Sequence, residues 1–214
     1  MVNPTQARAL LRAIRARNPR LEAFFGLLYF AALRPEEATN FRQGDMVHAA
    51  DGWGELHLTK ATPEVAEAWT DTGSRSEARN LKHRDDGAGR IVPCPPELAN
   101  LLRRHTDEYG VTRDGRLFAG IRNEGRLSST VYGRAWAQAR GDVLPEETQA
   151  SPLAKRPYDL RHAAVSTWLN AGVEPTRVAE WAGHSVHVLL RVYAKCLDGG
   201  ERAARDRVQQ ALEG

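Results

Sequence analysis

The run from Leu21 to Leu33 is almost uniformly apolar, with Glu22 as its charged exception. At 13 residues it is too short to cross a bilayer, because a spanning helix takes about 20 apolar residues. It has the right length for a helix enclosed by protein on all sides. A chain of 214 residues that is 42% hydrophobic can build a substantial core around such a helix. We therefore expect one domain, or one domain with a tail.

Helical and extended segments are predicted on both sides of this run. In chain order they are a helix from Pro4 capped by Asn3, strands near 55–58, 79–84 and 90–93, helices near 96–105 and 128–140, a mobile connection over 141–156, and short helices from Pro157 onward. Pro175 is expected to open one of these short helices and Ser185 to cap the next. The predicted fold class is mainly α with a small antiparallel β-sheet, an α+β arrangement.

An arginine, a histidine and a tyrosine are spaced along the helical stretch 158–193. His184 follows Arg161 by 23 residues, and Tyr193 follows His184 by nine. A guanidinium can bind two non-bridging oxygens of one phosphate, where charge accumulates in a transition state. A phenol is a weak nucleophile, with an ordinary pKa of about 10, and it needs such a polarised phosphorus. His184 could donate to the phosphate or accept the phenol proton, and the sequence does not choose.

The local motifs around these three residues resemble those of the tyrosine recombinases, the phage integrase family. Leu160-Arg161-His162, Ala182-Gly183-His184-Ser185 and Val192-Tyr193 fall where the family places them. The resemblance implies a recombinase catalytic domain over residues 1–197. It also implies that Tyr193 attacks DNA to form a 3′-phosphotyrosyl intermediate, through which strands are broken and rejoined.

The resemblance further implies a tail over residues 198–214. Its apolar positions are expected to form a helical stripe that docks in cis, or in trans on a neighbouring protomer. The N-terminal core-binding domain that family members usually carry is expected to be absent, because the first predicted helix begins at Pro4.

The family also carries a second arginine far upstream, and Arg34 matches it. Arg34 follows the apolar run, and Pro35 is expected to open a helix whose first amides could face the same anion. Glu37 matches an acidic position of the family and is expected to orient the guanidinium. Alone, Arg34 could equally be a helix-end charge that reaches solvent.

The family's lysine, which protonates the departing 5′ oxygen, has its candidate in Lys82. The segment 85–89 is predicted to form a turn between the strands 79–84 and 90–93, which would place Lys82 on a β-hairpin. Lys60, His83 and Arg84 lie nearby, so the register of this hairpin is open by a residue or two. The alternative is a solvated charge near a turn.

Tyr158 departs from the family pattern, which has histidine or sometimes lysine three residues before the second arginine. A tyrosine can donate a hydrogen bond to phosphate but cannot carry positive charge. We expect it to keep the hydrogen bond and lose the acid–base function, and an inactive protein is the alternative that this departure raises. In this respect the chain resembles integrases of actinobacterial plasmids and phages, whose high-GC genomes would suit its abundant alanine and arginine.

Other features of the sequence bound its partners. The net charge is +3, and 151–195 holds six Lys or Arg against three Asp or Glu, which favours a phosphate-rich partner. Cys94 and Cys196 do not have the spacing of a disulfide framework or a metal site. His184 and His187 form an H-x-x-H spacing without an accompanying Glu or Cys cluster, so no metal and no cofactor are expected. No signal peptide is recognised, and a cytoplasmic protein of the bacterial nucleoid is expected.

The expected partner is a double-stranded DNA attachment site. The resemblance also implies a homo-tetramer on synapsed DNA, a separately supplied core-binding domain or accessory proteins, and no membrane. A non-catalytic DNA-binding remnant that regulates an intact integrase is the alternative function. An enzyme that relaxes supercoils in the manner of a type IB topoisomerase is a third.

Overall fold

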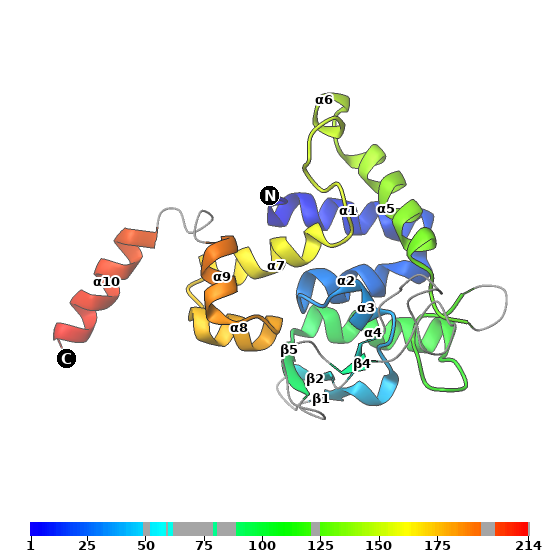
Figure 1. Ribbon diagram of the computed structural model, residues 1–214, viewed down its shortest axis with the longest axis horizontal. Helices are drawn as coiled ribbons and strands as arrows, with labels where there is room; N and C mark the ends of the chain where they lie inside the picture. The colour runs from blue at the N-terminus through cyan, green and yellow to red at the C-terminus, as the bar shows by residue number, and fades with distance from the viewer. Residues whose placement is uncertain are drawn as a thin grey trace.

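The computed structural model describes residues 1–48, 52–58, 60–61, 79–80, 89–120, 125–193 and 200–213. Within these residues the chain is mainly helical, with a three-stranded antiparallel sheet along the lower edge of the body in Figure 1. The predicted fold class is thus confirmed. Lys82, Cys196 and most of the predicted turn over 85–89 lie outside the described residues.

The first helix, α1 (Pro4–Arg17), begins where the sequence predicts. Asn3 and Gln6 form a capping box, in which each side chain accepts a hydrogen bond from the other residue's backbone N–H, at 2.8 and 3.1 Å. The buried face of α1 carries Leu10, Leu11 and Ile14, at the spacing of an amphipathic helix. The cap therefore fixes the start of α1, and the apolar stripe fixes the side that faces the core.

The apolar run folds as the central helix α2 (Glu22–Phe30), which follows a short 3-10 turn, η1 (Pro19–Leu21). It contacts α1, α4 (Pro96–Tyr109) and α7 (Asp159–Asn170), so it is enclosed on several sides. The Phe25 ring stacks on Trp136 with ring centroids 5.4 Å apart. The helix ends at Phe30 and not at Leu33, because Ala32 has a left-handed backbone with φ 50. The Leu33 N–H then turns back to the Leu27 carbonyl, at 3.2 Å.

The main sheet has the strand order β1 (Met46–His48), β2 (Gly54–Leu58), β5 (Arg90–Cys94). All its pairs are antiparallel, with Leu56 opposite Val92 and Leu58 opposite Arg90. A smaller ladder joins β3 (Lys60–Ala61) to β4 (Arg79–Asn80). Of the predicted strand 79–84 the structure describes only β4, which pairs with β3, and the predicted pairing of the remainder with 90–93 lies outside the described residues. The short helices α3 (Pro35–Ala38) and η2 (Gln43–Asp45) lead into the sheet.

The segment 141–156 is built into the body, whereas the sequence predicts a mobile connection. It contains the end of α5 (Ser129–Val143) and the short helix α6 (Glu146–Gln149). Arg140 donates hydrogen bonds to the carbonyls of Leu153 and Ser151, both at 2.9 Å, and the Trp136 indole N–H donates to the carbonyl of Ala154 at 2.8 Å. These bonds hold the segment against α5. They also give hydrogen-bond partners to backbone carbonyls that lie outside any helix or strand.

Three helices at the C-terminal side of the body form a second small core. They are α7, α8 (Pro175–Ala182) and α9 (Val186–Tyr193), and they pack side by side in Figure 1. Pro175 opens α8 as predicted, and the Ser185 hydroxyl accepts a hydrogen bond from the Val188 N–H at 3.2 Å at the start of α9. Gly183 ends α8 in the left-handed region (φ 66, ψ 46), which glycine adopts without the cost that a Cβ would bring.

The tail forms the helix α10 (Gly200–Glu213), as predicted. It lies at one end of the long axis in Figure 1, and its Arg207 side chain comes close to Gly172, just after α7. Val208 and Leu212, on its predicted apolar stripe, are 59% and 80% exposed. The chain's own core does not cover these two side chains, and docking on another protomer stays a prediction. None of the described helices is long and apolar enough to pass through a membrane.

Candidate active site

Arg34 lies at the junction of α2 and α3, where it is the N-cap of α3. Its backbone is extended (φ −72, ψ 150), as suits a residue that precedes proline. Its backbone N–H and its Nη1 donate to the two carboxylate oxygens of Glu37, and its Nη2 donates to the carbonyl of Gly183, all at 2.8 Å. The carboxylate of Glu37 thus bonds the N-cap amide of α3 in the place where an external anion was expected.

Glu37 joins two arginines beneath the site. Its fully buried carboxylate accepts two parallel hydrogen bonds from Arg90, each 2.6 Å long, in addition to the bonds from Arg34. Burial alone would raise the pKa of Glu37, but the charges and hydrogen bonds of Arg90 and Arg34 lower it to about 2. Arg90 also donates from Nε to the carbonyl of Trp181 at 2.9 Å, which ties β5 to α8. The predicted role of Glu37, to orient the Arg34 guanidinium, would rest on its hydrogen bonds to Arg34.

Arg161 is on the first turns of α7, and its side chain is fully buried. Nη1 donates to the carbonyl of Ala32 and Nη2 to the carbonyl of Ala182. Nη2 also lies 2.9 Å from His184 Nε2. Burial lowers the pKa of Arg161, and repulsion from Arg34 adds to this effect, with a smaller opposing attraction from Glu37. Among the described residues no group accepts a hydrogen bond from the buried Nε of Arg161.

His184 follows the left-handed Gly183, which turns the chain so that the imidazole meets Arg161. A guanidinium can only donate, so the bond to Arg161 requires a lone pair on Nε2 and places the proton of the neutral ring on Nδ1. Burial, followed by the charges of Arg161, Arg34 and Arg90, lowers the pKa of His184 to about 3. His184 is therefore neutral near pH 7 and presents an N–H donor at Nδ1, which is buried and unpartnered within the described part of the chain.

Tyr193 ends α9 and is almost fully buried, at 1% exposure. Its ring lies between two imidazoles, with centroids 6.2 Å from His184 and 5.7 Å from His162. Its hydroxyl oxygen is 2.7 Å from Nδ1 of His162. Arg161, His184 and Tyr193, which are spaced along residues 161–193, thus lie together in the folded chain.

Tyr158 occupies the N-cap of α7, at the edge of this cluster. The Arg161 guanidinium carbon is 5.9 Å from the centre of its ring, and the His162 ring packs edge-on against it at 5.0 Å. The structure therefore brings together five of the six predicted site residues, namely Arg34, Tyr158, Arg161, His184 and Tyr193. The sixth, Lys82, lies outside the described residues.

The arrangement of the helices around this cluster can be compared with known proteins. No protein-family profile matches the sequence, and no curated protein does. Among solved structures, the integrase of the transposon Tn1549, in complex with a circular intermediate DNA, matches 96% of this chain with a TM-score of 0.71 and 18% identity. The catalytic domain of the bacteriophage HP1 integrase matches 96% of this chain and 93% of its own length, with a TM-score of 0.57 and 18% identity.

The chain has the fold of a tyrosine recombinase catalytic domain. The XerH site-specific recombinase, bound to its difH substrate, adds a third match, with a TM-score of 0.61 and 14% identity over 88% of this chain. This chain spans 65% of the Tn1549 integrase chain and 48% of the XerH chain. At these identities the likeness concerns the fold, which the HP1 domain shares over nearly its full length.

The fold adds two residues, Arg90 and His162, to those that the sequence predicts at this site. Arg90 is buried on the inner face of β5, together with Val92 and Cys94. The sequence could have indicated this burial, because side chains two residues apart on a strand point to the same face and Val92 and Cys94 are apolar. His162 was part of the Leu160-Arg161-His162 motif but received no role. It lies four residues after Tyr158, which places both on one face of a helix.

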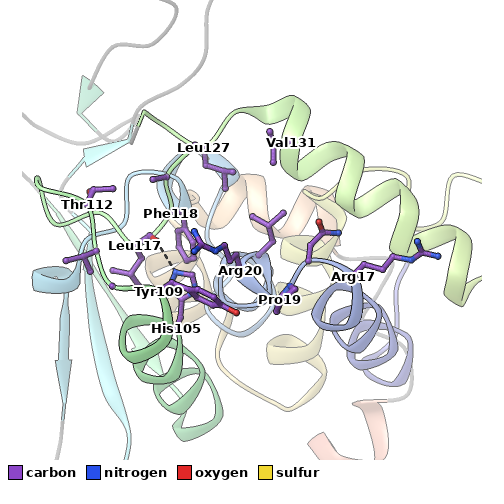
Figure 2. Close-up of a pocket in the computed structure, with 16 residues that line it drawn as sticks. Arg17, Pro19, Arg20, His105, Tyr109, Thr112, Leu117, Phe118, Leu127 and Val131 are labelled. Carbon is purple, nitrogen blue, oxygen red and sulfur yellow. Dashed lines mark hydrogen bonds between the residues drawn. The ribbon is translucent and has the colours of Figure 1, made fainter. Parts of the chain in front are cut away.

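A separate pocket of about 610 Å³ opens between the end of α1, α4 and the start of α5 (Figure 2). Arg20 lies over the ring of Tyr109 there, with 4.8 Å between the guanidinium carbon and the ring centre. His105 Nε2 is 2.9 Å from the carbonyl of Leu117. None of the five clustered site residues lines this pocket. Among the described residues, no group of three or more His, Cys, Asp or Glu could hold a metal ion.

Proposed function

We propose that this chain is the DNA-breaking and rejoining domain of a site-specific recombinase, with Tyr193 as its nucleophile. The single observation that carries the proposal is the convergence of Arg34, Arg161, His184 and Tyr193 from four separate segments of the chain. Arginine, histidine and tyrosine in contact at one place suit the cleavage of a phosphodiester, as argued from the sequence. The likeness to DNA-bound integrase structures supports the same conclusion.

In the proposed reaction the phenol oxygen of Tyr193 attacks the scissile phosphorus. The bond from phosphorus to the 5′ oxygen breaks, which leaves a 3′-phosphotyrosyl link and a 5′ hydroxyl. Rejoining reverses these steps with the 5′ hydroxyl of another strand. The phosphotyrosyl bond conserves the energy of the phosphodiester, so the exchange needs no nucleotide.

The remaining residues are assigned to the charge that develops on the phosphate. Arg34 and Arg161 would stabilise the phosphorane, since fixed donors in a water-poor site act strongly on developing charge. His184 would donate from Nδ1, the nitrogen that its bond to Arg161 leaves protonated. Tyr158 would add a neutral hydrogen bond, and Lys82 would protonate the departing 5′ oxygen.

The proposed partner is a double-stranded DNA attachment site, bound by a tetramer in which two duplexes are synapsed. A core-binding domain would complete the grip on DNA. The phosphate contacts of a catalytic domain position it on DNA but read little sequence. Without that second domain we therefore expect weak binding with little sequence preference.

The test is covalent trapping. The protein is incubated with nicked suicide duplexes that carry randomised sites, and DNA-linked protein is sought on a denaturing gel. The wild-type protein should form an adduct, Tyr193→Phe should form none, and Tyr109→Phe, at the distant pocket of Figure 2, should behave as wild type.

An adduct that persists in Tyr193→Phe would refute the assignment of the nucleophile. A wild-type protein that binds DNA yet forms no adduct, even with a core-binding domain supplied in trans, would favour the regulatory remnant. Supercoil relaxation without recombinant products would favour the topoisomerase-like enzyme.

A further inference from the structure

His162 contacts the hydroxyl of Tyr193 directly. Nδ1 of His162 and the hydroxyl oxygen are 2.7 Å apart, a normal length for a hydrogen bond between an imidazole and a phenol. The two residues come from different helices, α7 and α9, and their ring centroids are 5.7 Å apart. The proposed nucleophile is therefore already paired with a group that can exchange a proton with it.

His162 is uncharged near neutral pH. Burial lowers its pKa from the ordinary value, and the positive charges of Arg161 and Arg156 add to this effect against an opposing attraction from Asp159. A neutral imidazole has one nitrogen with a free lone pair. With its proton on Nε2, His162 can accept the phenol hydrogen at Nδ1.

The neighbouring candidates for this task are unsuited to it. His184 Nε2 is engaged by Arg161, and the pKa of His184 is lowered to about 3, so it is a very weak base. Tyr158 carries a phenol, which donates a hydrogen bond readily but accepts a proton poorly. His162 lies one helical turn after Tyr158, with its ring packed on the Tyr158 ring at 5.0 Å.

We propose that His162 is the general base of this chain, taking the phenol proton from Tyr193 as its oxygen bonds to phosphorus. The inference rests on the proposed function, because it assumes that Tyr193 attacks DNA. The phenol proton moves to Nδ1 while the new oxygen–phosphorus bond forms, which leaves an imidazolium. In rejoining, the imidazolium gives a proton from Nδ1 back to the departing phenol oxygen, so the base is regenerated with each cycle.

The surroundings of His162 can accommodate the charge that this step creates. His162 lines an open cavity of about 750 Å³ together with Asp159, through which its proton can exchange with solvent. Asp159 is also the attraction that raises the pKa of His162 against the effect of burial. Within the described part of the chain, the titratable and charged residues around this histidine or in the cavity that it lines are Asp159, Arg156, Arg161, Tyr158, Tyr193, His184, Lys155 and Met1.

Single-turnover adduct formation on the suicide duplex tests the proposal. His162→Gln can still hydrogen-bond to the phenol, but an amide cannot take up its proton. A general base contributes about 10²- to 10⁴-fold, so this variant should slow by at least about a hundredfold. His187→Gln, which removes an exposed histidine from α9, is the matched control and should keep the wild-type rate.

The pH profile separates a base from a residue that only positions Tyr193. The wild-type rate should fall as pH drops through the lowered pKa of His162 and level off above it. In His162→Gln the rate should instead climb about tenfold per pH unit through the neutral range, because only the small phenolate fraction could then attack. A His162→Gln enzyme with the wild-type rate and the wild-type profile would overturn the proposal.

Nitrogen NMR of histidine-labelled protein keeps this inference distinct from the proposed function. If the wild-type protein forms no adduct, the proposed function fails, and the tautomer of His162 still decides the question of the base. A lone pair on Nδ1 at pH 7 to 8 supports the proposal. A proton on Nδ1, which would make His162 the donor to Tyr193, overturns it.

Discussion

Arg34 and Arg161 carry the same guanidinium group, but their surroundings stabilise it in opposite ways. Arg34, 18% exposed, forms a salt bridge with the buried carboxylate of Glu37, and this contact raises its pKa against the effect of burial. Arg161 is fully buried, and its partners are two backbone carbonyls and a neutral histidine, so its pKa is lowered. One arginine is charge-compensated, and the other is only hydrogen-bonded.

This difference indicates where an anion would matter most. Carbonyl dipoles satisfy N–H donors without cancelling the charge, and a buried charge without a counter-ion is costly. Arg34, Arg90 and Arg161 surround the single carboxylate of Glu37, which leaves positive charge in the described part of the site uncancelled. A phosphate whose charge grows in the transition state would complete the balance, chiefly at Arg161.

The largest expected effect is that of Arg161→Lys on adduct formation. Lysine keeps the charge but loses the planar fork that bonds both carbonyls and His184. We expect the single-turnover rate to fall by at least about 10³-fold, in the range known for arginines that stabilise phosphoryl transfer. Arg34→Lys, whose charge is shared with Glu37, should lose about 10²-fold. Equal losses in the two variants, at matched thermal stability, would contradict the comparison.

Removing the counter-ion should destabilise the compensated side. Glu37→Gln leaves Arg34 and Arg90 without a negative partner, and breaking such a buried pair costs about 3–5 kcal/mol. Urea denaturation gives this free energy of unfolding. Glu180→Gln is the matched control, because its salt bridge with Arg177 is exposed on α8, and it should change stability by less than about 0.5 kcal/mol. A small effect of Glu37→Gln would show that Arg90 and Arg34 find other partners.

Acid should reproduce part of that loss without a mutation. The pKa of Glu37 is lowered in the folded protein from 4.5 to about 2. The resulting stability, about 3 kcal/mol, is present above pH 4.5 and is lost as pH falls toward 2, because the unfolded chain binds the proton first. Denaturation curves between pH 6 and 2 should converge for the wild type and Glu37→Gln. Parallel curves would remove Glu37 as the titrating group.

The smallest expected effect comes from the glycine between the two regions. A Cβ at Gly183 would lie 3.2 Å from Arg90 Nη1 and 3.4 Å from Arg34 Nη1, at a left-handed φ of 66. Gly183→Ala should therefore cost about 1–2 kcal/mol in thermal denaturation. Gly133→Ala, within α5 and with open space around it, should instead stabilise by up to about 1 kcal/mol. The sign of the two changes is the test.

The parts of the site that sequence could predict are those encoded locally. Arg161 and Tyr193 lie on the predicted helices α7 and α9, and His184 lies in the turn between α8 and α9, beside Gly183 and Ser185, which the sequence identifies as caps. Arg34 could be predicted only through the family resemblance, because the apolar run and Pro35 alone also fit a helix-end charge that reaches solvent.

The rest depends on contacts between distant segments. The burial of Arg90 depends on the register of β5 against β2, and that of the segment 141–156 depends on hydrogen bonds from Arg140 and Trp136. The pairing of His162 with Tyr193 joins residues 31 positions apart. The apolar stripe of α10 predicts a helix, but it does not predict which surface covers the stripe. Val208 and Leu212, on that stripe, are exposed.

Ala32 links the strain of the backbone to the most buried charge of the site. Its left-handed conformation costs an L-residue about 1–2 kcal/mol, and its carbonyl is the one that accepts from Arg161 Nη1. Glycine at this position would relieve the strain and stabilise the fold, but it would also let the carbonyl move beneath the guanidinium. Selection for thermal stability would therefore favour glycine at residue 32. In such a variant Arg161 would be held less rigidly, because its carbonyl partner could move.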